Sequence, residues 1–161
     1  MSPRSKGCLV TVRGLAFVLL AANLVAACGG PSASADMEVV DANAVRAEIA
    51  AALKDVPLPP GATINPTVPD EDASYEAGFG RQAVESLAMC AWFRYWLDAL
   101  GSNRTEEVAR ATETANQMST WAIYRGADQS YRDVIDNVIT NAKLGDPTAM
   151  STFVSANCRT A

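Results

Sequence analysis

Residues 82–100 constrain the fold of this chain most, because their apolar side chains surround nearly the whole circumference of a helix. The apolar set comprises Val84, Leu87, Met89, Cys90, Ala91, Trp92, Phe93, Trp96 and Leu97. A helix that is hydrophobic on all sides is normally buried at the centre of its domain. The segment therefore predicts an all-α bundle of four to five helices built around it, with Gly101 as its C-cap.

The segment before this central helix divides into a helix and a proline-rich stretch. Asp41 is placed to cap a helix that must end before Pro57, since a residue preceding proline disfavours helical backbone. The apolar positions of this helix, spaced near 3.6 residues, are Val45, Ile49, Leu53 and Val56. Residues 57–73 contain five prolines, so we expect an extended loop there and no strand.

Three more helices are expected after the central one. The first begins at Asn103, which with Glu106 resembles a capping box, and it ends at Gly126. The second has one apolar face, formed by Tyr131, Val134, Ile135, Val138, Ile139 and Ala142. The third starts at Asp146-Pro147, a cap followed by a proline at the first helical position. Short connections between these helices favour antiparallel neighbours.

The first 27 residues have the composition of an export leader. Three basic residues and no acidic ones precede a mostly apolar run from Gly14 to Ala27. This run is shorter than the roughly 20 apolar residues that a spanning helix needs. Residues 24–28 read Leu-Val-Ala-Ala-Cys, which resembles the lipobox of bacterial lipoproteins. The chain resembles small lipoproteins of actinobacteria in its leader, its composition and its Leu58-Pro59-Pro60-Gly61 turn.

The resemblance implies that Cys28 carries the membrane anchor. A diacylglycerol would be attached to its sulfur, the chain cleaved before it, and the new amino group acylated. The chain would then comprise a signal peptide over residues 1–27, a lipidated tether over 28–40 and one helical domain over 41–161. The protein would be held on the extracytoplasmic face of the cell membrane, or in an outer membrane where one exists. The alternative is an ordinary secretory leader followed by a chance cysteine.

Two cysteines remain for the domain, because Cys8 lies in the leader and Cys28 takes the lipid. Cys90 and Cys158 form a single pair in an exported chain, and we expect a disulfide between them. The alternative is a redox-active pair. Such pairs usually lie close together as Cys-x-x-Cys, whereas these cysteines are 68 positions apart.

Composition excludes several kinds of site. The chain has no histidine, so Ser-His-Asp and Cys-His catalysis and histidine-ligated metal sites are excluded. Without residues 1–27 the chain keeps 10 basic and 18 acidic residues, a net charge of −8, which argues against nucleic acid and anionic lipid surfaces as partners. The acidic run at residues 70–72 lacks the ligand spacing of a calcium loop. We therefore expect no metal and no cofactor.

Two features of the sequence bear on function. Glu85 lies on the apolar central helix, where a buried carboxyl group could serve a glycan-cleaving enzyme, although Arg81 could simply pair with it. The helix expected from Asn103 to Gly126 has a stripe of small residues that includes Ala111, Ala115 and Ala122. Trp121 and Tyr124 are expected on a different face of that helix. They either pack on neighbouring helices or, with Arg125 or Arg94, line a partner-binding groove.

Three functions are compatible with these features. The favoured one is a tethered module without catalytic activity that binds another envelope protein. The alternatives are a cell-wall glycan-cleaving enzyme that uses a single glutamate, and a carrier that holds a small apolar ligand in a bundle cavity.

Overall fold

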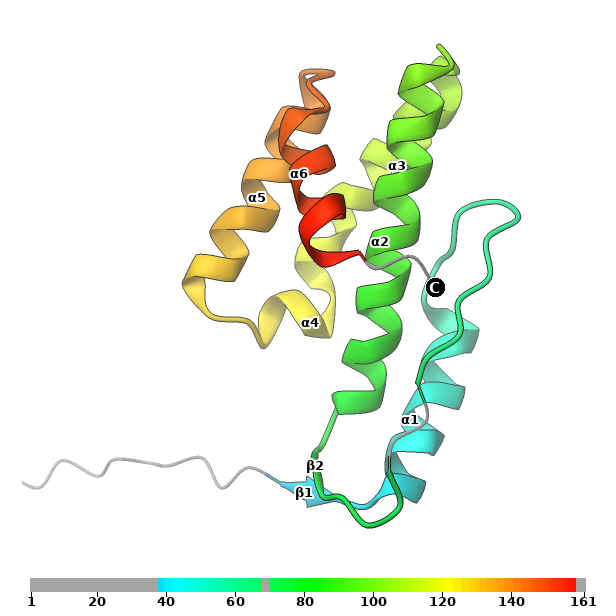
Figure 1. Ribbon diagram of the computed structural model, residues 1–161, viewed down its shortest axis with the longest axis vertical. Coiled ribbons are helices and arrows are strands. Elements are labelled where there is room, and N and C mark those ends of the chain that lie inside the picture. Colours follow the sequence, from blue (N-terminus) through cyan, green and yellow to red (C-terminus); the bar gives the residue numbers. More distant parts are fainter. Residues whose placement is uncertain (1–37, 68–69, 159–161) are drawn as a thin grey trace, which may run out of the picture. The chain divides into compact units, whose positions relative to one another are not determined.

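The long apolar segment forms helix α2 in the computed structural model, which describes residues 38–67 and 70–158 (Figure 1). The helices of this described part are α1 (Ala42–Asp55), α2 (Phe79–Gly101), α3 (Thr105–Gln117), α4 (Ala122–Arg125), α5 (Gln129–Lys143) and α6 (Thr148–Asn157). The all-α prediction is confirmed, with six α-helices in the described ranges where four to five were expected. The predicted signal peptide, Cys28 and most of the tether lie outside the described residues.

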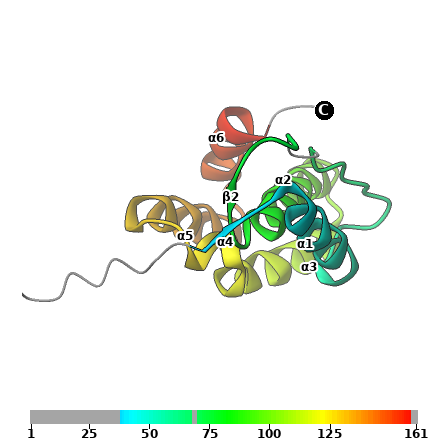
Figure 2. The same ribbon diagram turned by 90° about the horizontal axis from the view of Figure 1, so that it is seen from below.

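α2 is the central element, as its apolar circumference predicts. It packs against α1, α3, α4 and α6, and these helices surround it in the view along its axis (Figure 2). Its buried side chains include Val84, Met89, Trp92, Phe93 and Trp96. The indole Nε1 of Trp96 donates to Thr112 Oγ1 on α3 over 2.9 Å, so the buried polar atom of this large side chain is satisfied.

α1 begins and ends as predicted. The side chain of Asp41 accepts a hydrogen bond from the amide of Ala44 over 2.8 Å, and the helix stops at Asp55, before Pro57. The expected burial of Leu53 is wrong, because this side chain is 44% exposed. α1 packs mainly on α2, so it buries only a narrow face.

The proline-rich segment allows α1 and α2 to run in the same direction (Figure 1). Glu48, in the middle of α1, binds the start of α2, whereas Pro57, beyond the end of α1, accepts from Trp92 in the middle of α2. Parallel neighbours require a connection that returns along the length of α1, about 21 Å for 14 residues. Residues 57–67 contain no helix or strand and only one turn, at Pro60-Gly61, as the prolines predict.

A small β-ribbon closes the N-terminal end of the domain and was not predicted. Strand β1 (Val39–Val40) pairs antiparallel with β2 (Tyr75–Glu76). The amide of Ala77 also donates to the carbonyl of Glu38 over 2.9 Å. Residues 38–40, which the sequence interpretation placed in the tether, are therefore held against the segment that leads into α2.

The turn between α2 and α3 corrects two predicted caps. Gly101 is the last residue of α2, and the cap position is Ser102. Asn103 does not cap α3. Its backbone is left-handed, with φ of 57°, so it forms the turn, and α3 starts after Arg104.

The helix expected from Asn103 to Gly126 is broken in the middle. α3 stops at Gln117, a 3₁₀ turn covers Met118–Thr120, and Trp121 is extended with φ of −73° and ψ of 152° before α4 begins. Trp121 is only 9% exposed and belongs to the core. The burial of this indole accounts for the break, because a continuous helix would fix the side chain in a different direction.

α5 and α6 form an antiparallel hairpin (Figure 1). The carboxylate of Asp128 caps α5 through the amide of Tyr131 over 2.9 Å, and Gly145 makes the turn with φ of 74°. Asp146 accepts from the amide of Thr148 over 2.9 Å, but α6 starts one residue later than predicted, because the N-cap position is Pro147 and Thr148 is the first helical residue. The disulfide between Cys90 and Cys158 joins the end of α6 to α2.

Candidate functional site

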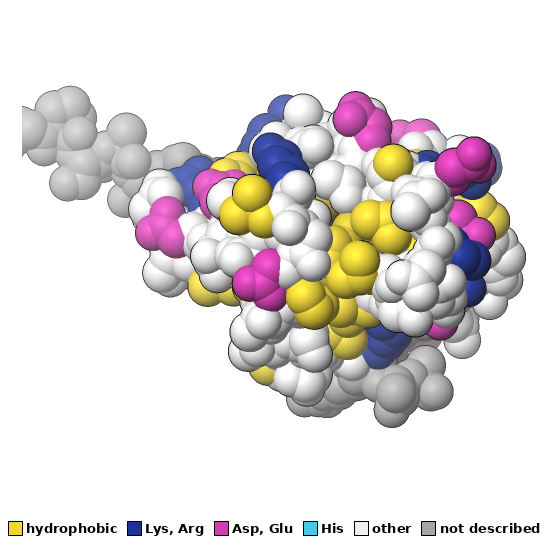
Figure 3. Space-filling model, turned by 90° about the horizontal axis from the view of Figure 1, so that it is seen from above, with side chains coloured by type: hydrophobic (Ala, Val, Ile, Leu, Met, Phe, Trp, Pro, Cys, Tyr) yellow, Lys and Arg dark blue, Asp and Glu magenta, His cyan; other side chains and the backbone are white. Residues whose placement is uncertain are grey.

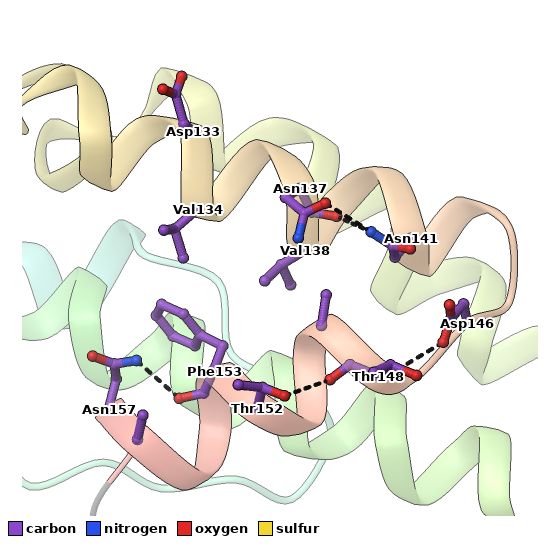
Figure 4. Close-up of a pocket in the computed structure, with 12 residues that line it drawn as sticks. Asp133, Val134, Asn137, Val138, Asn141, Asp146, Thr148, Thr152, Phe153 and Asn157 are labelled. Carbon is purple, nitrogen blue, oxygen red and sulfur yellow. Dashed lines mark hydrogen bonds between the residues drawn. The ribbon is translucent and has the colours of Figure 1, made fainter.

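A groove with a volume of about 630 Å³ lies between α5 and α6 in the described part of the chain (Figure 4). We call it the α5–α6 groove. It is lined by Asp133, Val134, Asn137, Val138, Asn141, Asp146, Thr148, Ala149, Thr152, Phe153, Ala156 and Asn157. The groove is open to solvent along its side. It is therefore a surface feature and not an internal cavity.

The floor of the α5–α6 groove is apolar. Val134 and Val138 contribute from α5, while Ala149, Phe153 and Ala156 contribute from α6 (Figure 4). Val138 and Phe153 are buried, but Val134 is 48% exposed. Val134 therefore leaves apolar surface at the edge of the groove floor, as five other large hydrophobic side chains do elsewhere on the described surface.

The uncharged polar rim forms its hydrogen bonds within the helices. Asn141 Nδ2 donates to the carbonyl of Asn137 over 2.8 Å and to its side-chain oxygen over 3.0 Å. Thr152 Oγ1 donates to the carbonyl of Thr148 over 2.9 Å, and Asn157 Nδ2 donates to the carbonyl of Phe153 over 3.0 Å. These side chains therefore have donors already in use and need no ligand to satisfy them.

The charged side chains of the lining are both acidic. Asp133 lies on α5 toward one end of the groove and Asp146 in the turn at the other end (Figure 4). Hydrogen bonds from the hydroxyl and the amide of Thr148 lower the pKa of Asp146, so it is ionised at neutral pH. Arg132 and Lys143, the basic residues of α5, are outside the lining.

Hydrophobic side chains also gather in a hollow where the α5–α6 turn and the end of α2 lie (Figure 3). Leu144, in that turn, is 79% exposed. Exposed apolar surface in the hairpin thus continues beyond the groove itself.

The aromatic residues proposed from sequence do not form an exposed site. Trp121 lies in the core. It therefore packs on neighbouring helices and does not line an exposed groove. The hydroxyl of Tyr124 donates to the carboxylate of Asp136 on α5, 2.9 Å from each oxygen. This hydrogen bond raises the pKa of Tyr124. Arg125 is exposed at the end of α4, and Arg94 donates to the carbonyl of Cys158 over 2.6 Å.

Glu85 has a structural role in the arrangement seen here. It is 1% exposed. One carboxylate oxygen accepts from Arg81 Nε over 2.9 Å, and the other accepts from the amide of Ile123 over 2.8 Å. Glu85 therefore satisfies a free amide in the first turn of α4. Glu85 is not among the residues that line the α5–α6 groove.

Glu48 acts in the same way on α2 and was missed from sequence. Its carboxylate oxygens accept from the amides of Gly78 over 2.7 Å and Gly80 over 2.8 Å. A Cβ at Gly80 would lie 2.5 Å from the carbonyl oxygen of Val45, so only glycine allows this close contact. The two glycines so close together at the start of an apolar helix are the signal in the sequence that could have revealed it.

The described residues contain no group of three or more His, Cys, Asp or Glu side chains able to hold a metal ion. In the acidic run, Glu71 binds Arg46 over 2.9 Å. Within residues 38–67 and 70–158, no helix has the length and apolarity required to span a bilayer. Compared with protein families, curated proteins and solved structures, the chain shows no match.

Proposed function

We propose that this chain is an envelope lipoprotein, anchored by a lipid on Cys28, whose helical domain binds another envelope protein without catalysing a reaction. Anchoring is supported by the lipobox-like residues 24–28 and the basic, apolar leader before them. A disulfide fits the oxidising compartment to which such a chain is exported. The α5–α6 groove is the observation that supports a binding role.

A protein surface suits the apolar floor of this groove. Val134, Val138, Ala149, Phe153 and Ala156 form that floor. An apolar partner surface would cover the exposed part of Val134 and remove it from water.

The carrier interpretation has less support from the geometry. The volume of about 630 Å³ is that of a ligand pocket. A carrier, however, must bury most of its apolar ligand, and this groove is open along its side. A partner protein brings its own surface and closes the groove when it binds.

Anchoring is tested by mass spectrometry of the protein extracted from native membranes. We expect a chain that starts at Cys28 and carries a diacylglyceryl group, and we expect the Cys28→Ala variant to leave the membrane fraction. A product that retains the initiator methionine, or a secreted chain with a free thiol at this position, contradicts the proposal.

Binding through the groove is tested by photo-crosslinking in living cells. The photoreactive amino acid p-benzoylphenylalanine replaces Thr152, which lines the groove, or Ser155, an exposed residue of α6 outside the lining. We expect Thr152 to give a discrete adduct with one envelope protein, and Ser155 to give none. Identical adducts from both positions, or no adduct from either, contradict a binding role for the groove.

A further inference from the structure

We infer that the occupant of the α5–α6 groove is a cationic amphipathic helix of about three turns, supplied by the partner protein. This inference rests on the proposed function and specifies the partner. Three properties of the groove lead to it: the spacing of its lining residues, the state of its polar groups and the positions of its charges.

The lining residues form two facing helical stripes. On α5, Val134, Val138 and Asn141 follow one another at intervals of four and three residues, and Ala149, Phe153 and Ala156 repeat the pattern on α6. Two antiparallel helices with such stripes provide a groove in which the ridges of a third helix can pack. The lining residues of α6, from Thr148 to Asn157, span about 13.5 Å at 1.5 Å per residue, which corresponds to between two and three turns.

The small side chains on α6 favour close approach of this third helix. Ala149 and Ala156 both line the groove and, being seven residues apart on α6, share one face of that helix. Alanine at both positions allows a helix axis to come within the 8–10 Å typical of packed helices.

A helix fits better than an extended peptide because of the backbone. An extended segment binds by adding hydrogen bonds to an unpaired strand edge. Both walls of this groove are helices, whose interior amides and carbonyls are already paired. A helical occupant satisfies its own backbone and needs only apolar contact with the floor.

The charges of the lining select a cationic occupant. Asp133 and Asp146 lie toward opposite ends of the groove, and no basic side chain lines it. A helix with a basic residue near the α5–α6 turn would pair with Asp146, whereas the carboxylate of Asp133 points away from α6 (Figure 4) and would act only over a longer distance. The acidic balance of the chain, 18 acidic against 13 basic residues, would also steer such a segment toward the domain.

The test uses synthetic peptides and the full chain in phosphatidylcholine nanodiscs, with empty nanodiscs as the blank. Three labelled 14-residue peptides share one apolar stripe: one is flanked by lysines, one by glutamates, and one is lysine-flanked with a central proline that breaks the helix. By fluorescence anisotropy we expect the lysine-flanked helix to bind at least about 10-fold more tightly than the other two, and more tightly at low salt.

Variants show whether the peptide occupies the groove. Ala156→Arg fills the groove from an exposed position and should weaken binding at least about 10-fold. The double variant Asp133→Asn and Asp146→Asn should weaken it about 5-fold. The matched control, Glu106→Gln with Glu113→Gln, removes two exposed carboxylates of α3 and should stay within about 2-fold. Circular dichroism and the melting temperature confirm that each variant is folded.

Three results would overturn the inference: equal binding of the glutamate-flanked peptide, unchanged binding to Ala156→Arg, or equal losses in the two double variants. The crosslinking experiment at Thr152 separates these failures from failure of the proposed function. A partner captured there through an acidic or non-helical segment keeps the proposed function and refutes the cationic helix.

Discussion

α2 and the α5–α6 hairpin both carry regular apolar stripes, yet they use them differently. In α2 the stripes are covered on every side, and Phe93 and Trp96 are 0% exposed. In the hairpin one side packs inward through Ile135 and Met150, while the other leaves Val134 48% exposed beside the α5–α6 groove. The same residue types therefore build the core in one region and leave apolar surface exposed in the other.

The number of neighbouring helices explains the difference. α2 packs against four helices, whereas α5 packs mainly against α6 and α3. A helix on the outside of a bundle has a buried face and a free face, and a free face is normally polar. Here Val134 is the one apolar side chain among the exposed residues of α5, and it lies at the edge of the α5–α6 groove.

The largest expected effect comes from truncating the covered region. Phe93→Ala removes a fully buried ring that contacts Phe153 edge-on, and we expect a loss of about 4 kcal/mol in the free energy of unfolding. Val134→Ala should cost less than about 1 kcal/mol, because that side chain is already half in water. Denaturant titration of the two variants checks this. Equal losses of unfolding free energy in the two variants would show that the two regions are packed to the same extent.

The disulfide gives the next largest effect, because it ties the hairpin to α2. Replacing both Cys90 and Cys158 by serine opens a loop of 68 residues, and we expect a loss of about 3 kcal/mol in the free energy of unfolding. Hydrogen exchange should show α6 opening before α2 does. Uniform exchange in both helices would show that the hairpin is held by packing alone.

Glu85 tests how firmly α2 holds the segment that leads to the hairpin. Glu85→Ala leaves the amide of Ile123 without its partner in a buried place, and we expect a loss of about 2 kcal/mol. Glu106→Ala, at an exposed glutamate of α3, serves as the control and should cost under about 0.5 kcal/mol. A Glu85→Ala variant as stable as this control would remove the capping role.

The smallest effect concerns acid pH and is specific to the hairpin. The carboxylate of Asp128 accepts hydrogen bonds from the hydroxyl of Ser130 and the amide of Tyr131, and these lower its pKa. The carboxylate of Asp146 accepts hydrogen bonds from Thr148, which lower its pKa in the same way. Their contribution to stability is therefore complete above the unfolded-state pKa of about 4 and is lost as the pH falls through the lower folded-state pKa.

Asparagine substitutions isolate this contribution, because asparagine caps a helix without titrating. In the double variant Asp128→Asn and Asp146→Asn, we expect a smaller loss of hairpin stability between about pH 4 and pH 2 than in the unmodified chain. Amide exchange of α5 and α6 measures it. An identical pH dependence in both chains would assign the acid sensitivity to other carboxylates.

Features set by neighbouring residues could be predicted from the sequence. The burial of α2 follows from its own side chains, the end of α1 from Pro57, and the start of α6, to within one residue, from Asp146. The pairing of Cys90 with Cys158 followed from counting cysteines and needed no geometry. Each of these rests on local backbone rules or on elimination.

Features set by distant residues could not be predicted. Glu48 binds amides 30 and 32 positions away, and Glu85 binds one 38 positions away. Trp121 breaks its helix because of a core that the local sequence does not describe. The groove itself escaped prediction, because Val134 and Val138 have equivalent places in the amphipathic pattern and only packing decides which one is covered.

The β-ribbon determines how mechanical load enters the domain. A pull on the N-terminal segment reaches residues 38–40 first, and these are hydrogen-bonded to residues 75–77, just before α2. The tension therefore passes directly toward the most deeply packed helix instead of unwinding α1 from its end.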